Sequence, residues 1–191
     1  EVMAFVCSFE VAVQMACTSL EIGRNGLGAV GRELKDKDAI MDSLSNPSWN
    51  RLFHVYDAFK LGLPFNKIHT STMMDPWFLR QIEELVLLEK DLENETIESI
   101  SRELLMEAKR KGYADRQIAH LLNCLESKVH ERRHAEGITR VYKLVDTCAA
   151  EFPAVTPYYY SSFEEEEIES EVSDLMKVIV LGSGPNRFGQ G

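Results

Sequence analysis

The residues whose spacing most clearly suggests chemistry are His130, Glu131 and His134, in the run HERRH. On a helix, two histidines four residues apart share one face, where they can bind zinc while the glutamate activates water. However, this stretch is charged on nearly every side, whereas apolar residues usually enclose a zinc site. No third ligand is evident, although Glu151 or Glu164 can be proposed. We favour a solvated helix and keep a zinc metallohydrolase as the alternative function.

A second chemical candidate is the run VIVLGSGPNRFGQG, residues 178–191. Apolar residues lead into glycines, as a strand leads into the phosphate-binding loop of a nucleotide-binding α/β domain. The run is not a dinucleotide fingerprint, because Arg187 stands in place of the third glycine, and it lacks the P-loop lysine. Glycine amides beside a guanidinium still suit a phosphate or a carboxylate. The helix and sheet that would complete the site are missing, so we expect no activity from this loop alone.

Charge and composition narrow the choice of partners. The chain has 191 residues and a net charge of −10, and its pI is about 5.0. Such an acidic surface repels phosphate groups, so we expect neither nucleic acid nor a membrane as a partner. The chain begins without an initiator methionine or a basic signal-peptide region, which predicts an excised fragment. The cysteines are too far apart for a thiolate zinc site and fit a reducing cytoplasm: Cys7, Cys17, Cys124 and Cys148.

Apolar periodicity and capping residues predict a helical domain over residues 8–150. Asp75 and Pro76 are expected to open one helix, whose Phe78 faces the core and whose Glu89 faces solvent. Pro47 is expected in the first turn of another. The remaining helices are predicted at residues 8–22, 37–44, 47–61, 96–111, 115–124 and 127–136.

The helical pattern ends after Gly137. Residues 151–176 are predicted to form an extended linker, and residues 177–191 a strand and a glycine-rich loop. Tyr158, Tyr159 and Tyr160 lie in the linker, and we interpret them as a docking segment. Alternation along an extended strand is expected to put Tyr158 and Tyr160 on one side, where their hydroxyls can bond a neighbouring domain. The acidic run that follows them leaves open a binding module for a basic partner. The predicted fold class is all-α: an irregular small helical domain, then an extended segment and one terminal β-strand.

Six segments together resemble the large subunit of carbamoyl-phosphate synthase, and the resemblance covers essentially the whole chain. They are EVMAF, SLEIGRNGLG, DPWFLRQIEELVLLE, KRKGYADRQIA, VYKLVDTCAAEFPAVTPYYYSSFEEE and VLGSGPNRFGQG. In that family, a helical oligomerisation domain joins two ATP-grasp halves. The resemblance implies that residues 1–7 end the first synthetic half, residues 8–150 form the oligomerisation domain, residues 151–176 form the linker and residues 177–191 begin the second half.

The resemblance also implies a function. The parent is a cytoplasmic ligase of arginine and pyrimidine biosynthesis that makes carbamoyl phosphate from bicarbonate, ammonia and two ATP. It uses Mg²⁺ or Mn²⁺ and K⁺, and a glutaminase small subunit supplies the ammonia. The connecting domain holds the halves in register, self-associates, and contributes no catalytic side chain, metal ligand or cofactor, so we expect no activity from it alone. The substrate-proximal loop of the second half would include Gly182, Gly184, Asn186, Arg187 and Gly189.

The sequence departs from the family near its start. Val6-Cys7 stands where family members usually have Gly-Arg. This leaves open either an altered junction with the first half or a different neighbour for the first helix.

Overall fold

The fold is mostly helical, as the sequence predicts. The computed structural model describes residues 2–20, 22–28, 36–148, 150–153, 156–164, 168–170 and 172–180. Within these ranges, no helix has the length and apolar character needed to cross a membrane. The elements are α1 (Phe9–Ser19), α2 (Lys37–Ser45), α3 (Arg51–Lys60), α4 (Phe65–Thr72), α5 (Pro76–Glu93), α6 (Arg102–Arg110), α7 (Asp115–Leu121), α8 (Glu126–Ala135), β1 (Val141–Leu144) and β2 (Tyr159–Ser162).

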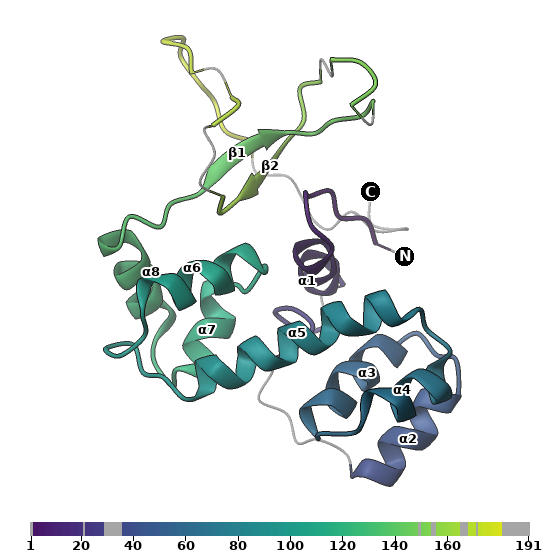
Figure 1. Ribbon diagram of the computed structural model, residues 1–191. Coiled ribbons are helices and arrows are strands. Elements are labelled where there is room, and N and C mark those ends of the chain that lie inside the picture. Colours follow the sequence, from purple (N-terminus) through teal and green to yellow (C-terminus); the bar gives the residue numbers. More distant parts are fainter. Residues whose placement is uncertain are drawn as a thin grey trace.

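Helix α5 is the longest described helix, and the other helices are arranged around it (Figure 1). Helices α3 and α4 pack against α5 and α2 packs on α3 and α4, while α6, α7 and α8 gather near the other end of α5. Helix α1 also packs on α5. The start of α5 matches the prediction, because the Asp75 side chain accepts a hydrogen bond from the Trp77 amide at 2.8 Å and Pro76 occupies the first turn.

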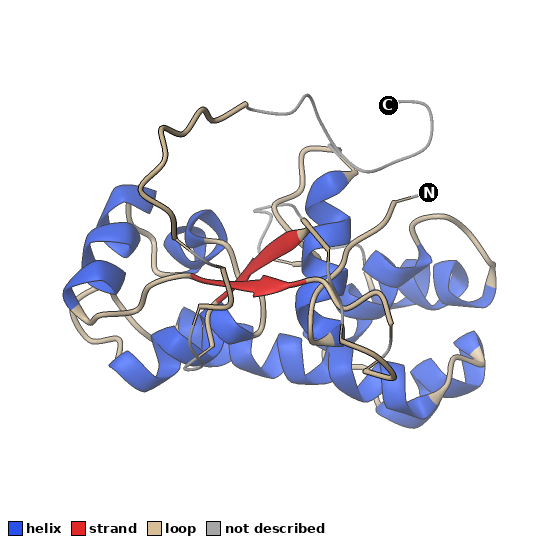
Figure 2. Cartoon of the chain, turned by 90° about the horizontal axis from the view of Figure 1, so that it is seen from above, coloured by secondary structure: helices blue, strands red, loops and turns tan. Residues whose placement is uncertain are grey.

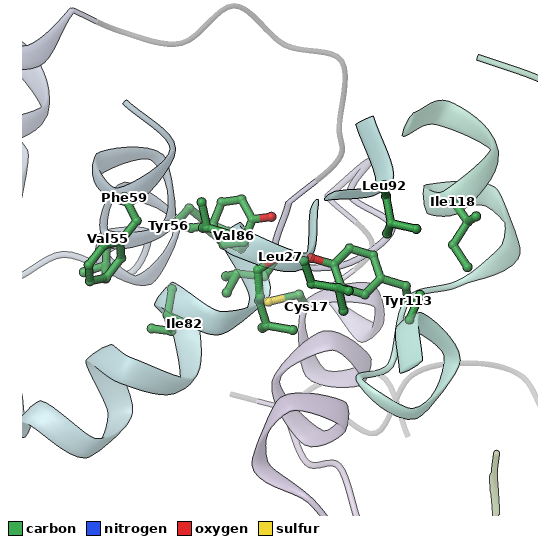
Figure 3. Packing of buried hydrophobic residues seen from close by; sticks show 14 of the residues in the cluster. Cys17, Leu27, Val55, Tyr56, Phe59, Ile82, Val86, Leu92, Tyr113 and Ile118 are labelled. Carbon is green, nitrogen blue, oxygen red and sulfur yellow. Dashed lines mark hydrogen bonds between the residues drawn. The ribbon is translucent and has the colours of Figure 1, made fainter. Parts of the chain in front are cut away.

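One hydrophobic core continues across α5 (Figure 3). Tyr56 of α3 and Tyr113, which follows α6, point toward one another with Leu27 between them. The Tyr113 hydroxyl donates to the Leu85 carbonyl at 2.7 Å, and the Tyr56 hydroxyl donates to the Glu89 carboxylate. The core therefore contains two hydrogen-bonded tyrosine hydroxyls as well as apolar side chains.

Two side chains of α5 differ from the prediction. Phe78 is 42% exposed rather than in the core, because Leu79 takes the inward position in the first turn. Glu89 is buried rather than solvated, since Tyr56 and Lys60 of α3 satisfy its carboxylate. Apolar periodicity uses residue types alone and therefore assigns every charged residue to the solvent-facing side of a helix. It cannot show that a charged side chain is buried against a partner on another helix.

Two helix predictions also need correction. Pro47 lies outside α3, which begins at Arg51 after Asn50. Helix α4 was not expected, because its sequence FNKIHTST is largely polar and has no capping residue before it. It is held by the two buried residues Ile68 and Thr72.

The two strands form an antiparallel hairpin that lies over the helices, as seen from above in Figure 2. Val141 pairs with Ser162 and Leu144 with Tyr159. The predicted linker therefore contains a paired strand, and its partner comes from the end of the predicted helical domain. Residues 177–180 have no regular secondary structure, and the rest of the predicted terminal strand and its loop lies outside the described residues.

Candidate docking site

Helix α1 is apolar on nearly every side, with Glu10 as its one charged residue. Ser8 caps the helix by accepting a hydrogen bond from the Val11 amide. Cys17 is buried, whereas Met15 is 40% exposed. Because a helix that is apolar all round is normally covered all round, the exposed side around Met15 is a candidate docking surface.

Met15 lines a groove of about 640 Å³ between α1, the N-terminal segment and the hairpin. We call it the α1–hairpin groove. This volume accommodates several side chains of a partner, and most of the lining is apolar. The residues that line it are Met3, Ala4, Phe5, Met15, Ser19, Val145, Thr147, Tyr158, Tyr159, Tyr160 and Ser161.

The tyrosines of the predicted docking segment all line this groove. Tyr158 and Tyr159 are exposed, and Tyr160 is partly buried. Burial and the nearby Cys7 and Glu164 raise the pKa of Tyr160 to about 12. Its hydroxyl therefore stays protonated at neutral pH and can donate a hydrogen bond to a partner.

A hydrogen-bonded contact joins the N-terminal segment to the end of the hairpin. The Cys7 thiol donates to Glu164 Oε1 at 2.5 Å, and the Ser162 hydroxyl donates to the same oxygen at 3.0 Å. Burial and the Glu164 carboxylate raise the pKa of the Cys7 thiol, so it remains a neutral donor. Cys7, one of the two residues that depart from the family, thus joins the N-terminal segment to the hairpin beside the groove.

A buried ionic cluster lies beneath the hairpin. Asp115 accepts hydrogen bonds from Lys109 at 2.7 Å and from Arg133 at 3.1 Å, and all three side chains are largely buried. We call these residues the Asp115 cluster. Burial alone would raise the pKa of Asp115, but the two cations outweigh it and hold that pKa below its ordinary value. Burial lowers the pKa of Lys109, and Asp115 opposes this change.

Phe163 connects the Asp115 cluster to the hairpin. Its ring centroid lies 4.7 Å from Lys109 Nζ and 5.2 Å from Arg133 Cζ, and the Arg140 guanidinium lies at 5.7 Å. Cations near an aromatic face are attracted to it, most strongly where water is excluded. Because Phe163 directly follows β2, this contact fixes the hairpin over α6 and α8 and so maintains the groove.

The zinc alternative finds no support in the structure. His130 and His134 are exposed, and Glu131 is paired with Lys128 at 2.9 Å. The inward position of this motif is taken by Arg133, whose guanidinium pairs with the Asp115 carboxylate. Across the described parts of the chain, no three His, Cys, Asp or Glu side chains are grouped so that they could hold a metal ion.

The remaining predicted site residues, Gly182, Gly184, Asn186, Arg187 and Gly189, lie outside the described residues. Their assignment to a substrate loop stays a prediction. In the sequence, only the three tyrosines at 158–160 indicated a docking surface at this groove. Met15 and Phe5 were missed, although the near absence of charge on α1 was a usable signal.

Comparisons with known proteins agree on one family. The model of the carbamoyl-phosphate synthetase large chain, oligomerisation domain, matches residues 1–137. The chain is 46% identical over 199 residues to the carbamoyl phosphate synthase large chain of Archaeoglobus fulgidus, and 44% identical over 192 residues to that of Synechocystis sp.. The large chain of Ralstonia nicotianae is 42% identical over 193 residues. Each match covers 100% of this chain and 18% of the relative, so the chain spans less than a fifth of their length.

Proposed function

Since this chain belongs to the oligomerisation-domain family of the carbamoyl-phosphate synthetase large chain, we propose that it is the connecting and self-association domain of such a large chain. In this proposal, residues 1–7 end one ATP-grasp half, residues 8–150 are the domain itself, residues 151–176 are the linker and residues 177–191 begin the other half. The observation that carries the proposal is the α1–hairpin groove. It is an apolar docking surface built from the two segments that would lead to the halves.

We further propose that the groove binds the second half, which follows the hairpin in the chain. The residues after the hairpin expose large apolar side chains that need a partner, since an unpaired apolar segment is prone to aggregation. They are Val172, Leu175, Met176, Val178, Ile179 and Val180. Because both partners belong to one chain, a moderate contact area is enough to hold them together.

For the parent chain, we propose synthesis of carbamoyl phosphate from bicarbonate, ammonia and two ATP, in the cytoplasm and in the service of arginine and pyrimidine biosynthesis. The names of the relatives support this activity. A glutaminase small subunit would supply ammonia, and the halves would hold ATP, Mg²⁺ or Mn²⁺, and K⁺. In this proposal those groups belong to the halves, and this domain has a structural role.

Met15→Asp in the full-length large chain tests the docking role. A carboxylate in the apolar groove must be desolvated when the second half docks, which weakens docking. We therefore expect the two halves to be misaligned. Overall carbamoyl phosphate synthesis should fall by about tenfold or more, because small misplacements of reacting groups are costly. ATP turnover by each half on its own should change much less.

Thr18→Asp is the matched control. Thr18 is exposed on the same helix but does not line the groove. Equal synthesis by the Met15→Asp and Thr18→Asp chains would refute the docking role of the groove.

A further inference from the structure

A second apolar surface lies where α1 and α5 begin. The Phe9 ring is 5.4 Å from the Trp77 ring and 5.2 Å from the Phe78 ring, centroid to centroid. Trp77 and Phe78 contact each other edge to face at 5.0 Å. We call these three residues the aromatic triad. None of them lines the α1–hairpin groove, so the docking role proposed for that groove does not account for them.

The position of the triad follows from how α5 starts. Asp75 and Pro76 fix the first turn, and Leu79 is the first residue of α5 to enter the core. Trp77 therefore remains 52% exposed beside the exposed Phe78. Large adjacent exposed aromatic side chains are unusual on a soluble monomer, and aromatic residues are common anchors of interfaces. The triad is thus a candidate interface.

The N-terminal segment, whose Met3 and Phe5 line the α1–hairpin groove, also joins the triad to residue 1, where a preceding domain would be attached. Its exposure alternates, so that Met3, Phe5 and Cys7 face solvent while the residues between them are half-buried. Eight fully extended residues span at most about 28 Å, so any domain joined at residue 1 begins within reach of the triad.

We infer that the aromatic triad docks the ATP-grasp half that precedes this domain in its own chain. The inference rests on the proposed connecting role. A second copy of the chain is the less suitable occupant, because a stable complex usually buries about 800 Å² on each partner. Three partly covered aromatic side chains offer much less, whereas covalent linkage makes a small contact sufficient.

Hydroxyl-radical footprinting with mass spectrometry tests which partner covers the aromatic triad. The oxidation of Trp77 and Phe78 is compared between this chain and the full-length large chain over a wide range of concentrations. We expect oxidation to be at least about fivefold slower in the full-length chain at every concentration, because a docked interface excludes water from its centre. Trp49, which is 76% exposed on the connection before α3, serves as the reference and should be oxidised equally in both.

Equal oxidation of the triad in the two proteins would overturn the inference. Protection that appears only as the concentration rises, in this chain as well as in the full-length chain, would assign the triad to a second copy and would also overturn it.

A pair of variants on α5 makes the test specific. Trp77→Glu and Leu87→Glu change side chains that are 52% and 53% exposed on the same helix. In the full-length chain, Trp77→Glu should raise the oxidation of Phe78 to its level in the isolated chain that carries the same substitution, whereas Leu87→Glu should leave Phe78 protected relative to the isolated Leu87→Glu chain. Equal effects of the two variants would contradict the inference. If Met15→Asp impairs synthesis as expected while the triad proves unprotected, only this inference fails and the proposed function stands.

Discussion

Replacing Asp115 with alanine is expected to lower the free energy of unfolding by about 3–5 kcal/mol, as for other buried ion pairs that lose one partner. The Lys109 and Arg133 side chains are only 4% and 5% exposed, and both bond to the Asp115 carboxylate. Without it, two cations remain buried near one another with no counter-charge. Urea unfolding followed by circular dichroism measures the change, provided that the dependence on urea keeps the same slope.

The effect of Asp115→Ala should depend on pH. Because the pKa of Asp115 is lowered in the folded protein, its contribution is fully present above the ordinary aspartate pKa of about 4. It is lost as the pH falls through the lower pKa of the folded state. The difference between wild type and variant should therefore be full at neutral pH and shrink in acid.

Glu131→Ala provides the control, since Glu131 pairs with Lys128 on the surface of α8 and both side chains are exposed. Exposed pairs contribute little to stability, so its unfolding midpoint should match that of the wild type. A midpoint for Asp115→Ala as high as that of Glu131→Ala would show that the cluster does not hold the fold together.

Gly28→Ala is expected to destabilise the protein by about 3 kcal/mol or more. A Cβ at this position would lie 2.2 Å from both Cζ and the hydroxyl oxygen of Tyr56. Tyr56 is fully buried and donates to Glu89, so it cannot simply swing away. Overpacking a core costs about 1–3 kcal/mol, and weakening a hydrogen bond to a charged group adds about 1.5–3 kcal/mol.

A double-mutant cycle with Tyr56→Ala isolates the cause of this destabilisation. Removing the ring should relieve the overlap, so Gly28→Ala should cost much less in the Tyr56→Ala background. Gly62→Ala is the comparison, because its positive φ of 73° brings strain but no atom lies within 4 Å of the added Cβ. If Gly28→Ala lowers the free energy of unfolding equally with and without Tyr56→Ala, overlap with the Tyr56 ring is not the cause.

Capping side chains located some helix starts but not all of them: Ser101 caps α6 by accepting from the Leu104 amide, whereas the sequence predicts this helix from residue 96. Asp75 caps α5 as expected, Ser8 caps α1, which is predicted from residue 8, and Gly112 with a φ of 85° follows α6, which is predicted to end at residue 111. Gly112 also lets α1 approach, because an added Cβ would lie 2.9 Å from the Val11 Cα. That second role is a tertiary contact, and no local pattern reveals it.

The hairpin was beyond local prediction. Its strands are joined by a long connection rather than a two-residue turn, so no hairpin signature marks them. Their register depends on contacts with other segments. Phe163 is held by the Asp115 cluster, and Glu169 accepts a hydrogen bond from the Leu144 amide at 2.7 Å. Each of these contacts joins residues that are far apart in the sequence.

The candidate docking site was predictable only in part. The tyrosines at 158–160 suggested docking, but the groove also needs Phe5 and Met15 from two other segments. The family, by contrast, was readable from long ordered segments of sequence, and its model matches residues 1–137. Family membership therefore identifies the domain, whereas only the fold shows which surfaces are free to dock a partner.

Light scattering across a wide range of concentrations tests most directly the central claim that this domain self-associates. A parallel sample that ends at Asp174 lacks the exposed apolar residues Leu175, Met176, Val178, Ile179 and Val180, and so separates specific association from aggregation. We predict that in both samples the mass rises from the monomer, 21.7 kDa for the whole chain, to a defined closed oligomer. A monomer mass at every concentration in both samples would contradict the account.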